Sequence, residues 1–182
     1  MPGCFIGVVG PSGAGKDSLI DAARRHFRDD GPVVFARRVI TRPAGAGGED
    51  HVALGADAFE DAAAAGAFAL HWQAHGLRYG IPIEVDAAIA RGAAAVANLS
   101  RSVIDDVRRR YVNRRIIVVT ADTNVLARRL AARGRESAED IAQRLRRAPY
   151  GLPSGEDVVV IGNNGSLEAA ESAFIEAIQG VL

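Results

Sequence analysis

A glycine-rich turn that ends in a lysine is the segment of this sequence best suited to chemistry. It runs from Gly10 to Lys16 as GPSGAGK, between an expected strand and an expected helix, which is the context that a P-loop requires. Glycines let successive backbone N–H groups point inward, and the helix start adds the positive end of its dipole. Lys16 can then reach the β- and γ-phosphates of a nucleotide. The alternative is a glycine turn followed by a chance lysine. The expected phosphate-binding residues are Gly10, Pro11, Ser12, Gly13, Ala14, Gly15, Lys16, Asp17 and Ser18.

Lys16 is also the only lysine in the chain. Of the 22 Lys and Arg residues among 182, 21 are Arg. Arginine and lysine are not interchangeable at a compact phosphate site, where a point charge on a flexible stem is needed. The position of this one lysine therefore supports a catalytic role in the P-loop.

The residue after the lysine departs from the usual P-loop pattern. A Ser or Thr normally stands there and binds Mg²⁺ through its hydroxyl, whereas this chain has Asp17 followed by Ser18. A carboxylate is a competent ligand for a hard cation, but it adds negative charge beside the phosphates. Either Asp17 contacts Mg²⁺, directly or through water, or it is a favourable charge at the helix start while another group holds the metal.

Three arginines have the spacing of a lid over a triphosphate. Arg129 and Arg133 are four residues apart and so share one helical face, and Arg144 follows on the next helix beyond Gly134. Closure of such a lid excludes water and neutralises the transferring oxygens. The alternative is a solvated basic face paired with nearby acids, and the P-loop favours the lid. The run 108–110 has no such support and is interpreted as a solvated helix face.

Apolar runs and periodic stretches alternate along the chain and predict strands alternating with helices. We expect strands at 5–9, 33–40, 68–72, 94–99, 116–120 and 158–161. We expect helices that begin at 17 or 18 and at Pro82, and others at 57–65, 102–111, 124–133, 138–148 and 166–179. This order is typical of an α/β fold, an open parallel sheet with helices on both faces. Residues 42–80 are expected to form a small insertion.

Composition excludes several other classes of protein. The 22 acidic residues balance the 22 basic ones, so there is no electrostatic case for a protein that wraps nucleic acid. The single Cys excludes an intramolecular disulfide and a Cys-rich metal site. No segment reaches the roughly 18 apolar residues of a membrane span. We expect one cytoplasmic domain over residues 1–182 with no nucleic-acid or membrane partner, and the oligomeric state stays open.

Several motifs together resemble the guanylate kinase group of P-loop nucleoside monophosphate kinases. They are the P-loop, Thr41-Arg42-Pro43, Gly48-Glu49, Tyr79-Gly80, the spacing of Arg129, Arg133 and Arg144, and Asn163-Asn164. The resemblance covers nearly the whole chain. It implies an acceptor-binding insertion at about 42–80 and a helical lid at about 129–147. It also implies that the three arginines contact ATP and that Asn163 lies near the adenine.

The departures from guanylate kinases concern the acceptor. Those enzymes read guanine with a Glu, and alignment on Tyr79-Gly80 puts Leu70 at that position. Leu70 would leave the guanine edge unpaired and lose most discrimination, which argues against guanine. The acceptor loop lacks a second Arg and has His51 near the position of a Tyr. An Asp-rich segment after the next strand is replaced by Asn98-Leu99-Ser100-Arg101.

These departures, including Lys16-Asp17-Ser18, resemble one branch of the group, the ribose 1,5-bisphosphate phosphokinases of phosphonate catabolism. The resemblance implies ATP- and Mg²⁺-dependent formation of 5-phosphoribosyl 1-diphosphate from a sugar phosphate. The acceptor oxygen is already anionic, so no general base is needed. The implied substrate-binding residues are Arg42, Glu49, His51, Tyr79, Asn98, Ser100 and Arg101. The alternatives are a nucleoside monophosphate kinase with altered base preference and a non-catalytic guanylate kinase-like binding module.

Overall fold

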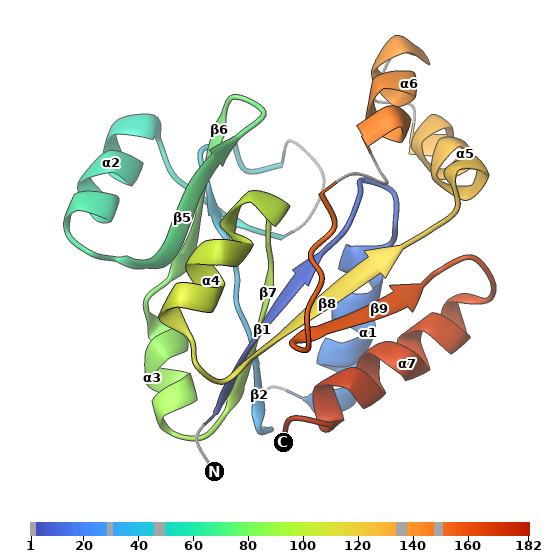
Figure 1. Cartoon of the computed structure of the whole chain (residues 1–182). Coiled ribbons are helices and arrows are strands. Elements are labelled where there is room, and N and C mark those ends of the chain that lie inside the picture. Colours follow the sequence, from blue (N-terminus) through green and yellow to red (C-terminus); the bar gives the residue numbers. More distant parts are fainter. Residues whose placement is uncertain (1–2, 29–30, 46–49, 134–137, 148–150) are drawn as a thin grey trace.

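A five-stranded parallel sheet forms the centre of the computed structural model, which describes residues 3–28, 31–45, 50–133, 138–147 and 151–182. The strands run in the order β2-β7-β1-β8-β9, and every neighbouring pair is parallel (Figure 1). They are β1 (Cys4–Val9), β2 (Val33–Phe35), β7 (Ala94–Asn98), β8 (Arg114–Thr120) and β9 (Val158–Gly162). The open parallel sheet predicted from the sequence is confirmed.

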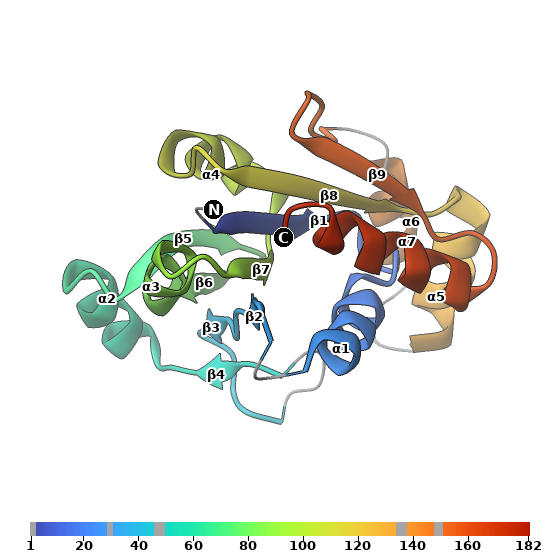
Figure 2. The ribbon, with the colours of Figure 1, turned by 90° about the horizontal axis from the view of Figure 1, so that it is seen from below.

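Helices cover both faces of this sheet, and alternate side chains of β1 pack into two separate cores. Figure 2 shows α4 (Ile104–Arg110) on one side and α1 (Lys16–Phe27) and α7 (Leu167–Gln179) on the other. Ile6 and Val8 pack into the core under α1 and α7. Phe5 and Val9 pack into the opposite core, with α3 (Glu84–Ala90) and α4. Burial on both faces explains why β1 is a continuous apolar run without alternation.

A second sheet lies beside the first and is built almost wholly from the expected insertion. Its order is β4-β3-β6-β5, with α2 (Ala56–Ala64) packed on β5. The strands are β3 (Val39–Ile40), β4 (Val52–Ala53), β5 (Phe68–Ala74) and β6 (Leu77–Pro82). Of these, β3–β6 and β5–β6 pair antiparallel, whereas β3–β4 is parallel.

Two predictions along this stretch are wrong. The strand expected at 33–40 is two strands, because the chain leaves the main sheet after Phe35 and enters the second sheet at Val39. The helix expected to begin at Pro82 begins at Glu84, because Pro82 is the last residue of β6, a strand that the sequence analysis did not find.

Two helices follow β8 and lie beyond the carboxyl ends of β1 and β8 (Figure 1). They are α5 (Thr123–Arg133) and α6 (Ala138–Arg147), which pack against each other. The first of the two helices therefore begins six residues before Arg129. Gly134 lies outside the described residues, and the lid itself stays a prediction. No helix in the described part of the chain combines the length and apolar character needed to cross a membrane.

Candidate active site

The glycine-rich turn leaves the carboxyl end of β1, the strand flanked by β7 on one side and β8 on the other. This is a topological switch point, where open α/β sheets bind ligands. Gly10, Gly13 and Gly15 have φ angles of 153°, 87° and 97°, which side-chain-bearing residues adopt at a cost. A Cβ on Gly10 would lie 2.1 Å from the carbonyl oxygen of Val119. Gly10 is thus required by the close approach of the loop to β8.

Helix α1 begins at Lys16 directly after this turn, with Gly15 as its N-cap residue. The N–H groups of the first turn of a helix have no intrahelical partner. In α1 no side chain among the described residues caps them either. The Lys16 ammonium donates to the carbonyl oxygens of Gly10 and Pro11, at 2.9 and 3.1 Å. An uncapped helix start and an ammonium folded over the turn form a site that fits a polyphosphate.

Two side chains from other elements hold the outer side of the turn. Asn163, which follows β9 and is 1% exposed, donates from Nδ2 to the carbonyl oxygen of Ala14 at 2.8 Å. Arg129 on α5 lies with Nη1 3.4 Å from the carbonyl oxygen of Gly13 and 3.5 Å from that of Ala14. Both residues therefore stabilise the P-loop itself. Contact of Asn163 with adenine and of Arg129 with phosphate stays a prediction.

Asn163 has acceptor capacity left for a ligand. Its Oδ1 is buried and accepts no hydrogen bond from the described part of the chain, and a buried unsatisfied oxygen is costly. A Cβ on Gly15 would lie 2.4 Å from its Nδ2, so the amide also fixes Gly15 as glycine. The site thus fits a nucleotide both at the helix start and at this orphaned oxygen.

Asp17 and Asn98 are brought together from positions 81 residues apart. Asp17 lies in the first turn of α1, and Asn98 is the last residue of β7. The Asn98 amide donates from Nδ2 to Oδ1 of Asp17 at 2.8 Å. Among the described residues no three His, Cys, Asp or Glu side chains form a metal-binding group. Mg²⁺ in kinases takes one or two carboxylates together with substrate phosphates, so Asp17 fits such a metal.

The second sheet brings together part of the predicted acceptor group. His51 is 9% exposed, and its Nε2 lies 3.1 Å from the carbonyl oxygen of Arg42. Nη2 of Arg42 lies 3.4 Å from the ring Nδ1 of His51. If Nε2 carries the proton and donates to the carbonyl, Nδ1 accepts from the guanidinium. His51 thus contacts Arg42 on both sides of its ring.

Tyr79 on β6 belongs to an aromatic stack. Its ring is stacked on Trp72 of β5, with centroids 5.4 Å apart and planes 7° apart, and the Arg38 guanidinium lies 5.3 Å from its centroid. Sequence reasoning missed Arg38 and Trp72, because the signal is a cross-strand pairing of β5 and β6 and not a linear motif. Planar groups in this arrangement hold the phenol of Tyr79 in one orientation.

The remaining predicted residues divide into two sets. Ser100 accepts from the backbone N–H of Ser102 at 3.3 Å and caps the short 3₁₀ helix η1 (Arg101–Val103), which places Arg101 at its start. Glu49, and the side chains of Arg133 and Arg144, lie outside the described residues, so their expected contacts stay predictions. The backbone places Arg133 at the end of α5 and Arg144 within α6.

Leu70 on β5 is buried in an apolar environment. It is 5% exposed and belongs to the core cluster that includes Ile81 and Val85. In the register of the second sheet it stands opposite Ile81. A side chain in this environment offers no hydrogen bond to a base edge, which supports the argument against guanine made from the sequence.

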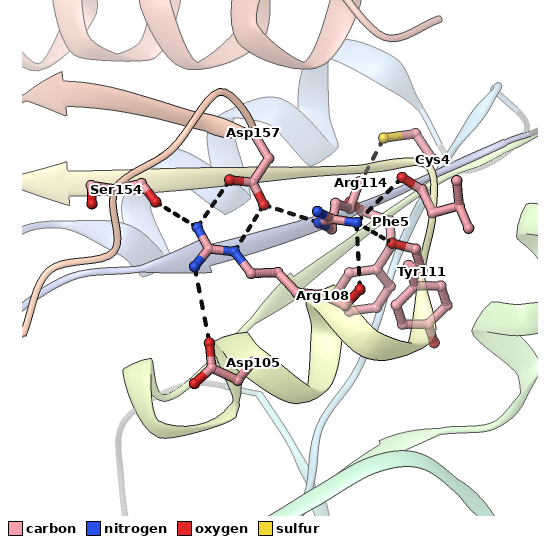
Figure 3. Close-up of polar contacts among 9 residues, drawn as sticks. Cys4, Phe5, Asp105, Arg108, Tyr111, Arg114, Ser154 and Asp157 are labelled. Atoms are coloured by element: carbon pink, nitrogen blue, oxygen red, sulfur yellow. Dashed lines mark hydrogen bonds and ion pairs between the residues drawn. The ribbon is translucent and has the colours of Figure 1, made fainter.

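The ionisable groups with shifted pKa values lie at the amino-terminal edge of the main sheet, away from the P-loop. Figure 3 shows Asp157, just before β9, between Arg108 of α4 and Arg114 of β8. Arg108 donates to both carboxylate oxygens, at 3.0 and 2.9 Å, and Arg114 donates at 2.9 Å. Hydrogen bonds from Arg108 and then Arg114 lower the pKa of Asp157 from 3.8 to about 2.

This edge corrects the interpretation of residues 108–110 as a solvated face at one position, Arg108, whose side chain is 29% exposed. Arg108 pairs with Asp157, and Arg110 pairs with Asp86, which also accepts from the Tyr111 hydroxyl at 2.6 Å. Burial raises the pKa of Tyr111. Within the run, the expectation holds for Arg109 and Arg110, whose side chains are 71% and 41% exposed. Arg109 also pairs with Asp106 of its own helix.

Comparison with known proteins identifies the family. The chain is 52% identical to a ribose 1,5-bisphosphate phosphokinase of Brucella melitensis over 98% of this chain and 93% of that protein. It is 48% identical to one from Rhizobium etli over 99% and 91%. It also matches a bifunctional ribose 1,5-bisphosphokinase-thymidine phosphorylase of Cupriavidus necator at 46% identity, over 97% of this chain and 29% of that protein.

Comparison with solved structures supports the fold. A crystal structure of guanylate kinase from Anaplasma phagocytophilum superposes with a TM-score of 0.64 at 17% identity, covering 99% of this chain and 86% of that one. No family model matches the sequence. Three findings lead to one conclusion. They are a guanylate kinase-like fold, a P-loop at the switch point, and identity at about half of all positions with relatives that the chain matches over nearly their whole length. The chain belongs to the ribose 1,5-bisphosphate phosphokinase family.

Proposed function

We propose that this protein transfers the γ-phosphoryl group of ATP to the 1-phosphate of ribose 1,5-bisphosphate. The products are 5-phosphoribosyl 1-diphosphate and ADP. The observation that carries the proposal is the combination of a P-loop turn from Gly10 to Lys16 on β1 and α1 with a buried Leu70 where a base reader would stand. A phosphate-binding kinase core is thus joined to a second sheet that offers guanine no polar contact at position 70.

The transfer exchanges one P–O bond for another. An anionic oxygen of the acceptor phosphate attacks the γ-phosphorus, and the bond from that phosphorus to the β–γ bridging oxygen breaks as ADP leaves. Because the nucleophile carries no proton at neutral pH, the protein needs no general base. It must hold two polyanions in line and screen their repulsion.

The nucleotide half of the site supports this chemistry residue by residue. The N–H groups at the start of α1 bind the β- and γ-phosphates, and Lys16 exchanges its loop carbonyls for phosphate oxygens. Asn163 and Arg129 keep the turn in its strained shape. Asp17 would hold Mg²⁺, which when bound neutralises charge on the phosphates.

The acceptor half is expected to use the second sheet and the end of β7. Arg42 and Arg101 are the proposed phosphate ligands, since a guanidinium binds phosphate oxygens in a fixed geometry. His51 contacts Arg42 on two sides, and the stack at Tyr79 presents a fixed phenol. Across the site from them, Arg133 and Arg144 would close over the γ-phosphate and exclude water. We place the reaction in the cytoplasm, with a small sugar phosphate as the acceptor.

A panel of acceptors tests the proposal. Formation of ADP is followed with ribose 1,5-bisphosphate, ribose 5-phosphate, GMP and AMP under identical conditions, with a no-acceptor reaction to subtract ATP hydrolysis. We expect kcat/KM for ribose 1,5-bisphosphate to exceed that for either nucleotide by at least about 10³, because a nucleotide with one phosphate would leave polar groups of a bisphosphate site unpaired. Equal or faster turnover of GMP would overturn the proposal and indicate a nucleoside monophosphate kinase.

A further inference from the structure

The hydrogen bond between Asp17 and Asn98 joins two parts of the site that the sequence analysis treated separately. Asn98 is 8% exposed at the end of β7, and its Nδ2 lies 2.8 Å from Oδ1 of Asp17. A carboxylate can only accept at this separation, so the Asn98 amide must present its nitrogen to Asp17. The bond engages one oxygen of Asp17, and no contact within the described residues is recorded for the other oxygen, which could bind a cation.

The two positions normally carry other groups in P-loop proteins. Mg²⁺ is held by a Ser or Thr hydroxyl after the lysine and by an aspartate on a neighbouring strand. In this chain the residue after the lysine is Asp17, and the end of β7, the strand next to β1, carries Asn98. The carboxylate thus stands on the helix, and the strand supplies a neutral hydrogen-bonding group. The site therefore keeps one carboxylate, but it stands on the helix and not on the strand.

The contact explains why both positions change together. A carboxylate at position 98 would face the carboxylate of Asp17 within hydrogen-bond distance, and like charges at this separation cannot both stay ionised without a large penalty. An amide removes the repulsion and adds a donor that orients the remaining carboxylate. Metal ligands commonly depend on such partners, whose loss lowers metal affinity about 10- to 100-fold.

The geometry also separates the two roles left open for Asp17. A charge that only stabilised the helix start would act through the helix dipole and would need no fixed side-chain orientation. No side chain among the described residues caps α1, and the side-chain partner that these residues give Asp17 is Asn98, on another element. The contact therefore favours a carboxylate that is oriented for a ligand.

We propose that Asn98 is a positioning residue that orients Asp17 for Mg²⁺, and that the pair replaces the hydroxyl–carboxylate arrangement of other P-loop proteins. This inference rests on the proposed function only in that it requires nucleotide binding. It assigns to Asn98, expected above to contact the acceptor, a role on the nucleotide side of the site. The substitution of one member without the other is then the damaging change, whichever member is altered.

A double-mutant cycle tests the pair without requiring catalysis. Asp17→Ser, Asn98→Asp and the double variant are compared with the unaltered protein by calorimetry of ATP binding, in Mg²⁺ and in EDTA. The quantity measured is the affinity for ATP in Mg²⁺ divided by the affinity for ATP in EDTA. Each single substitution should lower this ratio about tenfold or more. The double variant, which restores the usual arrangement, should recover most of the loss.

The protein contains a matched control pair. Asn164 donates from Nδ2 to Oδ1 of Asp122 at 3.0 Å, between the segments that follow β9 and β8. Asn164→Asp therefore creates the same juxtaposition of two carboxylates in a pair that does not include Asp17, and the Mg²⁺ ratio should not change. Asn98→Ala provides a second test if Asn98→Asp does not fold, because it removes the donor without adding charge, and it too should lower the ratio about tenfold.

Three outcomes would overturn the inference. They are an unchanged ratio in Asp17→Ser, an unchanged ratio in Asn98→Ala, and a double variant no better than Asn98→Asp. The proposed function fails separately. If the cycle behaves as described but ribose 1,5-bisphosphate is not phosphorylated, the acceptor is wrong and the inference stands.

Discussion

The ionic cluster around Asp157 gives a stability prediction that can be worked out from its geometry. The loop that returns to β9 meets α4 and β8 at this carboxylate, which Arg108 binds through both oxygens and Arg114 through one. Its side chain is 14% exposed, so water screens the contacts only in part. We therefore expect Asp157→Asn to destabilise the fold by more than a surface ion pair would.

The size and the pH dependence follow from the lowered pKa. The pKa falls from 3.8 to about 2, and one pKa unit corresponds to about 1.4 kcal/mol, so ionised Asp157 stabilises the fold by about 2 kcal/mol. Because the folded state holds the pKa down, this contribution is complete above about pH 4 and is lost as the pH falls toward 2. Asp157→Asn should lack this dependence.

Urea denaturation between pH 2 and 7 measures the effect. The unaltered protein and Asp157→Asn should differ by about 2 kcal/mol in the free energy of unfolding at pH 7 and converge near pH 2. Asp105→Asn is the matched control. Asp105 also faces Arg108, but at 3.9 Å and with a side chain 80% exposed, so its loss should change stability by less than about 0.5 kcal/mol. Curves for Asp157→Asn and the unaltered protein that stay parallel down to pH 2 would refute the reasoning.

Three further predictions concern the site. Lys16→Arg should keep its melting temperature yet lose about 10²-fold or more in kcat, because a planar guanidinium does not reproduce the ammonium; near-normal turnover would contradict the role given to Lys16. Gly15→Ala should lose about 1–3 kcal/mol of stability and bind ATP more weakly, since the new Cβ meets Asn163 at a φ of 97°. Urea denaturation measures the stability and calorimetry the binding of ATP. Unchanged values would count against the strained turn. Leu70→Glu buries a carboxyl group whose pKa must rise, so the variant should be more stable at pH 5 than at pH 8 relative to the unaltered protein; thermal melts at both pH values test this, and Leu70→Gln should show no such dependence.

The main sheet and its P-loop were predictable because their signals are local. The run ending at Val9, the glycines after it and the periodic helix from Lys16 lie within 27 residues, and each supports the next. Strands buried on both faces are continuous apolar runs, so β7 and β8 were found near their true bounds.

The errors occurred where structure depends on distant partners. The change of sheet between Phe35 and Val39 is set by pairing with β7 and β6, which follow much later in the chain. The burial of Arg108 against Asp157 was missed because the two residues are 49 positions apart. The bond between Asp17 and Asn98 likewise could not be predicted from each motif alone, since it depends on β1 and β7 being neighbours.

The identity of the product tests the central claim most directly. Purified protein is incubated with ATP, Mg²⁺ and ribose 1,5-bisphosphate, and the mixture is followed by ³¹P NMR with the Lys16→Arg variant as the control. The account predicts that the signal of the 1-phosphate is replaced by two mutually coupled signals of a diphosphate, in step with ADP formation, while the 5-phosphate signal persists. An unchanged sugar phosphate beside inorganic phosphate released from ATP, or a diphosphate formed at the 5-position, would contradict it.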